Sequence, residues 1–282
     1  KTTAQRWYIK FLQWKTQYLT HRQFILLLCV LVGVATGFAA LAMRSLTHFI
    51  EEVLVGNIIR YINYGFYVVF PAVGFLLVYL VKKYVIRKDV SHGIPSILYA
   101  VAKQKGIMKR FQAYGSLLTA PITIGFGGSV GLEGPMVVTG AGISSQIARL
   151  FHINQSDRML LLACASAAAL AAIFKVPLAG ILFAIEVFGL DLTLWSLLPL
   201  FVASLSGVLI SYLFFGNAAL LPIQVSGSFL MRNIPFYLLL GVVGGFMSAY
   251  FTFVYEWVNR FFARFSSPYV RLLIGGAVLG LL

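Results

Sequence analysis

The sequence predicts an all-α polytopic membrane protein, and three observations support this fold class. Hydrophobic residues make up 60% of the 282 residues and charged residues only 11%, whereas a soluble domain normally carries about 25% charged residues. Apolar runs long enough to cross a bilayer recur along the chain. The basic residues cluster in short segments between these runs, as they do in cytoplasmic loops. The net charge of +14 therefore indicates a membrane protein and no nucleic-acid partner.

Residues 1–22 are expected to form a helix in the cytoplasmic interface of the bilayer. Aromatic and basic side chains follow each other at helical spacing between residues 4 and 19, and Lys and Arg on such a helix reach from the apolar layer to water. Basic segments at residues 82–88 and 103–110 are expected on the same side. These features predict an integral membrane protein of the plasma (inner) membrane with a cytoplasmic N-terminus.

Residues 23–215 are predicted to form a first transmembrane repeat, residues 216–233 a loop, and residues 234–282 the start of an incomplete second repeat. The long apolar helices are expected at residues 23–46, 61–81, 156–173, 194–215 and 234–262. His48, Glu51 and Glu52 are expected in the loop after the first of them. A weak similarity between residues 24–33 and 236–245 fits the duplicated halves of transporters.

Two interruptions depart from a simple helical bundle. Residues 91–103 are too short to cross about 30 Å of hydrocarbon at about 1.5 Å per residue, so they indicate a half-helix started by Gly93 and Pro95. A second short stretch, residues 112–123, ends at a glycine-rich loop, and residues 136–151 form the helix after it. Broken helices lie in a membrane only where they line a cavity or are buried by protein. The two breaks therefore predict one site near mid-membrane, with helix N-termini converging on an anion.

Glu133 lies in the second break, between the glycine-rich loop and Pro135. A helix N-terminus offers free amides and about half a positive charge, so this carboxylate stands in the place of a bound anion. An ionisable residue inside a membrane is by default a functional hypothesis, and the alternative is a loop carboxylate that faces water. A dinucleotide-binding loop is disfavoured, because no strand precedes the glycines and no acidic residue follows about twenty positions on.

Three ordered motifs, GFGGSVGLEGP, SHGIP and AAALAAIFKVPLAGILFAIEVF, resemble the N-terminal half of the CLC chloride channels and chloride/proton antiporters. The resemblance covers nearly the whole chain. It implies two inverted repeats, a homodimer in the lipid bilayer with one anion pathway per subunit, chloride as the substrate and no cofactor. It also implies that Glu133 is the gating glutamate, which occupies an anion position and lets the anion pass by leaving it or by becoming protonated.

The anion is expected to bind between the two breaks. The residues assigned to this wall are Ser91, His92, Gly93, Ile94, Pro95, Gly131, Leu132, Gly134, Pro135 and Met136. His92 stands where the family usually has serine, and two readings of it stay open: it donates an N–H to the anion in a pH-dependent way, or it packs near the inner mouth. Leu132 replaces the family's frequent Arg or Lys, which is expected to weaken anion attraction at the outer mouth. The family's GxFxP motif and inner-gate tyrosine belong to the second half and are not among these residues.

Proton coupling is expected to depend on the end of the third motif. Proton-coupled members that resemble this chain often have two adjacent glutamates there, whereas Glu186 is followed by Val187, which cannot carry a proton. Glu133 and Glu186 form the possible proton path, although Glu186 is equally well explained as a structural group paired with a basic group such as Lys175 or with a backbone amide. Val187 therefore favours a voltage- or pH-sensitive chloride channel. The alternatives are a chloride/proton antiporter and a fluoride-exporting member of the same family.

A function outside transport is the remaining alternative. An enzyme would need a second catalytic group beside Glu133, and the sequence offers no Asp dyad, no nucleophile with its base and no cluster with metal-ligand spacing. Cys29 and Cys164 fall in apolar segments, where buried thiols are expected. Neither an enzyme nor a metal site is therefore predicted, and a non-transporting membrane scaffold is the reading from another class. For a transporter, external acid is expected to open the path, because protonation of Glu133 removes the charge that competes with chloride.

Overall fold

The structure is a computed structural model that describes residues 20–54, 69–87, 93–216, 230–265 and 267–281, and every regular element within these ranges is a helix. The predicted all-α fold is therefore confirmed, while the interfacial helix at residues 1–22 lies almost wholly outside the described residues. In chain order the elements are α2 (His21–Glu52), α3 (Phe70–Leu80), the π-helical turn η3 (Val81–Ile86), α4 (Ile94–Lys103), α5 (Arg110–Gly125), α6 (Glu133–Leu150), α7 (Gln155–Phe174), α8 (Pro177–Phe188), α9 (Leu194–Phe215), the 3₁₀ turn η4 (Met231–Asn233), α10 (Ile234–Ala263) and α11 (Pro268–Leu281).

Four helical segments in the described part are long and apolar enough to cross a bilayer: α2, α7, α9 and the segment Met231–Ala263 that contains α10. Helix α2 has 32 residues, so at about 1.5 Å per residue it is longer than the hydrocarbon is thick. His48, Glu51 and Glu52 lie in its last turns, which corrects the prediction of a loop there. A helix that exceeds the hydrocarbon can continue into water, where such side chains are solvated.

The short helices begin at the breaks that the sequence predicts. The half-helix expected at residues 91–103 is present as the 10-residue α4, and Pro177 starts the 12-residue α8. Of the span expected at residues 61–81, residues 61–68 lie outside the described part. What is described there is the 11-residue α3, which continues into η3 and ends at Arg87 in a left-handed conformation with φ 54°. The chain therefore turns after η3 instead of continuing as one straight helix.

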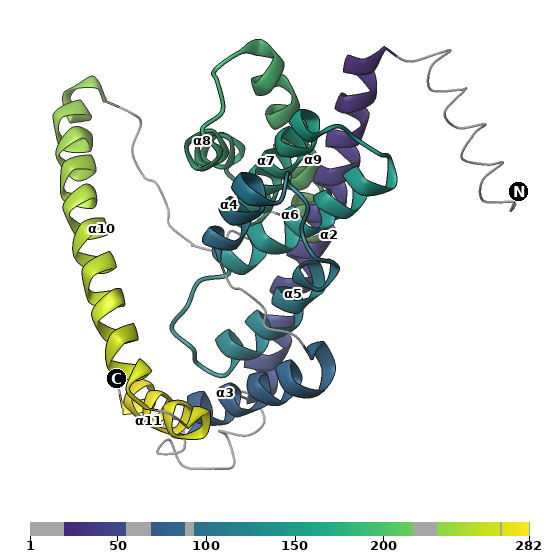
Figure 1. Cartoon of the computed structure of the whole chain (residues 1–282). Coiled ribbons are helices and arrows are strands. Elements are labelled where there is room, and N and C mark those ends of the chain that lie inside the picture. The colour runs from purple at the N-terminus through teal and green to yellow at the C-terminus, as the bar shows by residue number, and fades with distance from the viewer. Residues whose placement is uncertain (1–19, 55–68, 88–92, 217–229, 266, 282) are drawn as a thin grey trace, which may run out of the picture.

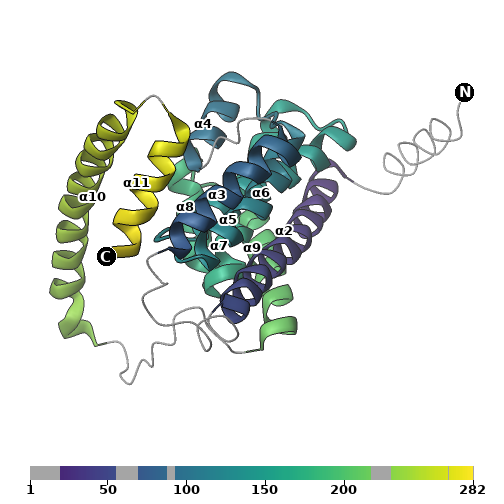
Figure 2. The same cartoon turned by 90° about the horizontal axis from the view of Figure 1, so that it is seen from below.

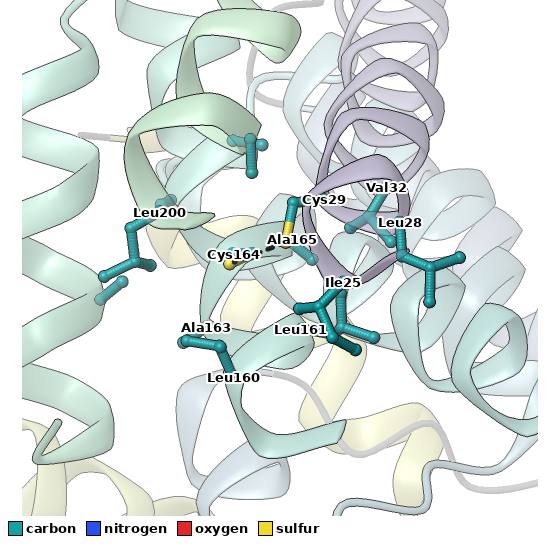
Figure 3. Close-up of a cluster of buried hydrophobic side chains, with 14 of the residues drawn as sticks. Ile25, Leu28, Cys29, Val32, Leu160, Leu161, Ala163, Cys164, Ala165 and Leu200 are labelled. Atoms are coloured by element: carbon teal, nitrogen blue, oxygen red, sulfur yellow. Dashed lines mark hydrogen bonds between the residues drawn. The ribbon is translucent and has the colours of Figure 1, made fainter. Parts of the chain in front are cut away.

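Helices α2, α7 and α9 form the core of the bundle, with α6 and α8 packed on α7 (Figures 1 and 2). Helix α7 is rich in alanine and buried along most of its length, which lets its neighbours approach closely. Figure 3 shows the contact between α2 and α7, where Cys29 and Cys164 lie with their Sγ atoms 3.7 Å apart. Both thiols are free and buried, as predicted.

The first turns of α2, α7 and α9 lie at the same end of the bundle. His21 Nε2 of α2 lies 2.8 Å from Asp157 Oδ2 in the first turn of α7. The Arg22 guanidinium stacks over the ring of Trp195 at the start of α9, with its carbon 5.2 Å from the ring centre. Three parallel helices therefore begin together, and polar contacts hold their starts in place.

Helices α10 and α11 extend away from this core. Helix α10 stands apart from the bundle in both views (Figures 1 and 2), and none of its residues is buried. Helix α11 packs on α3, where Gly276 lies against the backbone of Ala72. The ring centres of Tyr79 and Tyr269 are 5.3 Å apart in the same contact. The part of the fold that carries the two breaks is thus the compact bundle from α2 to α9.

The close approach of α2 to α9 predicts a matched pair of substitutions. A Cβ on Gly33 would overlap the carbonyl oxygen of Ala203 in α9, whereas nothing lies within 4 Å of a Cβ on Gly241 in α10. We expect Gly33→Ala to lower stability by about 1–3 kcal/mol through overpacking. Gly241→Ala, the control, should leave stability unchanged or raise it by up to about 1 kcal/mol, because alanine favours a helix. Thermal unfolding of the purified chains in detergent measures both, and equal melting temperatures would contradict the packing described here.

Candidate anion site at two helix starts

Helix α6 begins at Glu133, three residues earlier than the hydropathy pattern predicts. Gly134 and Pro135 therefore lie in its first turn, which accepts proline because the missing N–H has no intrahelical partner there. Residues 126–132 before it are not helical, and Gly127 has a φ of 84°, a value that favours glycine. The glycine-rich loop thus brings the chain sharply into the start of α6.

Several backbone amides at this helix start have no partner. In the part of the chain that the structure describes, no hydrogen bond is made by the N–H groups of Gly131, Leu132, Glu133 and Gly134. The N–H of Met136 is used within the helix, where it donates to Leu132 O at 2.9 Å. Free amides at the positive end of an 18-residue helix are suited to an anion. Pro135 and Met136 do not add to this set of donors.

The Glu133 side chain folds back over the loop. A Cβ on Gly131 would overlap its carboxylate, so the carboxylate lies against the Gly131 backbone. Glu133 is half-buried and forms no ion pair with any described residue. The carboxylate therefore lies at the loop that carries the unpaired amides, and its competition with an anion for them remains a prediction.

The other predicted helix start is at Gly93, which caps α4 with a φ of 93°. The Gly93 carbonyl accepts the Ser96 hydroxyl at 2.9 Å and the Ser96 N–H at 3.2 Å, so the first turn of α4 is well defined. Ser91 and His92 lie outside the described residues, and both readings of His92 therefore stay predictions. Ile94 is half-buried and Pro95 exposed.

The starts of α4 and α6 come together. A Cβ on Gly134 would lie 3.9 Å from the Cα of Gly93, an ordinary van der Waals contact. The predicted convergence of the two N-termini is therefore confirmed for this pair of glycines. That an anion binds between them remains a prediction.

Two polar residues of α6 fix the far end of α4, and sequence reasoning did not identify them. Ser145 Oγ accepts the Met108 N–H at 2.8 Å and donates to Gly106 O at 3.1 Å, while the Gln146 amide donates to Met108 O at 3.1 Å. Gly106 and Met108 follow the end of α4, so α4 and α6 lie near each other at their starts, are hydrogen-bonded beyond the end of α4 and run in the same direction. The polar run of residues 144–146 inside an apolar helix was the signal for this contact.

Glu186 does not make the structural pair that the sequence allowed. It is exposed on α8 and has no ion pair or hydrogen bond within the described residues, while Val187 beside it is half-buried. Lys175 instead donates to the carbonyl of Gly216 and lies 4.7 Å from the ring centre of Tyr212. The pKa of Lys175 is lowered by its partial desolvation and by repulsion from the Arg44 guanidinium. The Glu186–Lys175 pairing is therefore wrong.

A family model described as voltage gated chloride channel matches residues 73–282. The H(+)/Cl(-) exchange transporter ClcA of Citrobacter koseri is 27% identical over 268 residues, which cover 91% of this chain and 56% of that protein. The ClcA protein of Salmonella arizonae is 26% identical with the same coverage. The chain thus spans a little more than half the length of these curated relatives. It belongs to the voltage gated chloride channel (CLC) family, whose members are integral membrane proteins.

Solved structures show the same fold. A slow cyanobacterial Cl−/H+ antiporter matches 93% of this chain and 64% of its own, with a TM-score of 0.75 and 20% identity. A CLC-type fluoride/proton antiporter matches 93% of this chain and 66% of its own, with a TM-score of 0.71 and 23% identity. At these identities the likeness concerns the fold, which is of the CLC type.

Ser145 of α6 forms hydrogen bonds with residues 106–108, a contact that we call the clamp. The clamp predicts that substitutions of two neighbouring serines have different effects on stability. Ser145→Ala removes two hydrogen bonds and leaves the N–H of the buried residue Met108 without a partner. We expect it to lower stability by about 1–3 kcal/mol. Ser144 is equally buried, but its hydroxyl has no partner, so Ser144→Ala should be neutral or slightly stabilising. Denaturation of both variants in one detergent compares them, and an equal loss of stability would argue against the clamp.

Proposed function

We propose that this chain carries the anion site of a chloride/proton exchanger, with the anion held between the starts of α4 and α6 and with Glu133 as its gate. The observation that carries the proposal is the Glu133 carboxylate beside the unpaired amides of residues 131–134. The approach of Gly93 to Gly134 adds the second helix start to the same place. The names of the curated relatives, which are H+/Cl− exchange transporters, supply the substrate pair.

The proposed mechanism is electrostatic. Chloride loses its hydration shell on entering the site, and amide N–H groups together with two helix dipoles replace that shell. The ionised Glu133 side chain competes with chloride for the same donors, so the two exclude each other. A proton that reaches Glu133 removes its charge and frees the donors for chloride. Alternate occupation by a carboxylate and by an anion is thus the step that links protons to chloride.

We propose an exchanger and not the passive channel that Val187, taken alone, would favour. The relatives named above are exchangers, and the two structures above with the same fold are antiporters. A passive channel remains the second candidate, because Val187 offers no titratable group beside Glu186. In the exchanger, Glu186 has to receive the inward proton by itself, and its exposed position on α8 supports that role.

A homodimer with one pathway per subunit is proposed as the assembly. The apolar side chains that α8 and α9 expose, among them Leu182, Leu198 and Phe201, support it, since a second copy would cover them. Counting fluorescent copies in single vesicles tests the dimer, and one copy per active vesicle would contradict it. The plasma membrane and a cytoplasmic N-terminus are proposed from the distribution of basic residues.

Proton coupling is the deciding measurement for the function. In liposomes that contain the purified protein, an imposed chloride gradient should drive protons uphill. Glu133→Gln should retain chloride flux, lose its pH dependence and stop the proton movement, because glutamine cannot carry a proton. Chloride flux with no proton movement in the wild type would establish the channel instead. Flux that prefers fluoride to chloride would favour the fluoride exporter, and the absence of any anion flux would favour the scaffold.

The contact of Glu133 with residue 131 predicts a second route to the same phenotype. A methyl group on residue 131 would occupy the place of the carboxylate, so Gly131→Ala should displace Glu133 while keeping it titratable. We expect a faster chloride flux with a weaker dependence on external pH than in the wild type. Gly241→Ala in α10 is the control, since it makes the same exchange outside the proposed site and its methyl group would meet nothing within 4 Å. If Gly131→Ala had the pH profile of the wild type, the proposed position of the gate would be wrong.

A further inference from the structure

A cavity of about 500 Å³ lies where the ends of α2, α5 and α11 meet the start of α3. Helix α2 contributes Glu51 to its lining, α3 contributes Phe70 and Pro71, the end of α5 with the start of the glycine-rich loop contributes residues 124–127, and α11 contributes Leu279. Small-molecule sites in proteins usually have volumes of about 300–1,000 Å³. None of the described residues assigned to the anion site is in this lining, so the cavity is a separate candidate site.

Close contacts of glycines fix the walls of this cavity. A Cβ on Gly74 of α3 would overlap the side chain of Phe126, and a Cβ on Gly125 would overlap that of Ile50 in α2. Helix α11 lies against α3 at Gly276, one turn before the part that lines the cavity. The walls are therefore held by packing between the helices, and a preformed site costs less entropy to bind a ligand.

Glu51 is the only charged residue in the described lining. Its side chain is half-buried and forms no ion pair with any described residue. His48, one turn earlier on α2, is exposed and does not line the cavity. Arg44, two turns earlier, lies over the ring of Phe215 in α9, 4.5 Å from the ring centre. A carboxylate that is partly withdrawn from water attracts a cation more strongly than one in bulk water, so the cavity favours a positively charged ligand.

The rest of the lining indicates what kind of cation fits. Phe70 and Phe126 place two aromatic side chains in the wall, and aromatic faces attract ammonium groups. Leu54 and Leu279 add apolar surface for an uncharged body. A hydrated metal ion does not fit this lining, because calcium or magnesium needs several oxygen ligands and the cavity offers one carboxylate. The lining therefore matches an ammonium group attached to an aromatic or aliphatic body.

We propose that this cavity binds a small organic ammonium ion, with Glu51 as its charge partner, and that the bound ion restrains the glycine-rich loop. The lining residues Phe126 and Gly127 begin the segment 126–132, which leads to the Gly131 backbone beside the Glu133 carboxylate. A ligand in contact with the start of this segment limits its movement, so the gate opens less readily. Binding itself does not depend on the proposed function, whereas the effect on the gate rests on it.

Binding of benzyltrimethylammonium to the purified wild-type protein tests the site, because this ion joins an aromatic body to a permanent positive charge. A ligand-observed NMR titration in detergent measures its Kd. We expect Glu51→Gln to raise that Kd at least about fivefold, which is what one charge at contact distance contributes in water. Glu51→Asp keeps the charge and should keep the Kd within about threefold of the wild type. Phenylmethanesulfonate, which has the same aromatic body and a negative charge, should show no saturable binding.

Glu52→Gln is the matched control, since it removes the same charge from the next residue, which is exposed and does not line the cavity. Its Kd should stay within about twofold of the wild type. Equal increases in Glu51→Gln and Glu52→Gln would mean a general surface-charge effect and would overturn the site. A wild-type Kd in Glu51→Gln, or no saturable binding to the folded wild-type protein, would overturn it as well.

Chloride flux from liposomes tests the effect on the gate. Benzyltrimethylammonium at a saturating concentration on both sides should slow the wild-type flux at least about twofold, and the same concentration should slow Glu51→Gln less. Binding that leaves the wild-type flux unchanged would overturn the restraint of the loop and leave the binding site. A wild-type protein that binds the ion but carries no anion would overturn the proposed function and leave the binding site as well.

Discussion

The structure depends on one constraint, which is that a backbone amide inside hydrocarbon must have a partner. Long helices such as α2, α7 and α9 meet it internally, but every helix start leaves N–H groups over. Two such starts, at Gly93 and Glu133, lie near each other in the bundle. The amides of residues 131–134 are therefore open to a negative partner, and the Glu133 carboxylate lies against Gly131.

Helix α6 ties the parts of this arrangement together. Glu133 is its first residue, and twelve residues later Ser145 holds the connection between α4 and α5. That separation corresponds to about 18 Å of helix. Helices α4 and α6 thus approach each other near Gly93 and Gly134 at one end, and at the other end Ser145 forms hydrogen bonds with the segment that follows α4.

Much of this could be predicted from the sequence, because hydropathy and proline or glycine breaks report directly on helix length. The bounds of α9, residues 194–215, agree with the prediction, and α4 and α8 begin at their Gly or Pro signals. Hydropathy fails where a contact depends on a single polar atom. It does not reveal the hydrogen bonds of Ser145, the true partner of Lys175 or the first turn of α6 before Met136. Each of these depends on a neighbour that is distant in sequence or on a turn that apolar periodicity does not mark.

The contact between Glu133 and residue 131 also limits how the sequence can drift over evolutionary time. A Cβ at position 131 would overlap the Glu133 carboxylate, so a side chain there would force the glutamate to move, whereas the backbone angles do not require glycine, since φ is not positive. A lineage that replaced the glutamate by a shorter residue would release position 131 from this restriction, and the two positions should therefore vary together among homologues. A homologue with a larger residue at position 131 would therefore be expected to have its glutamate in another position or to have replaced it.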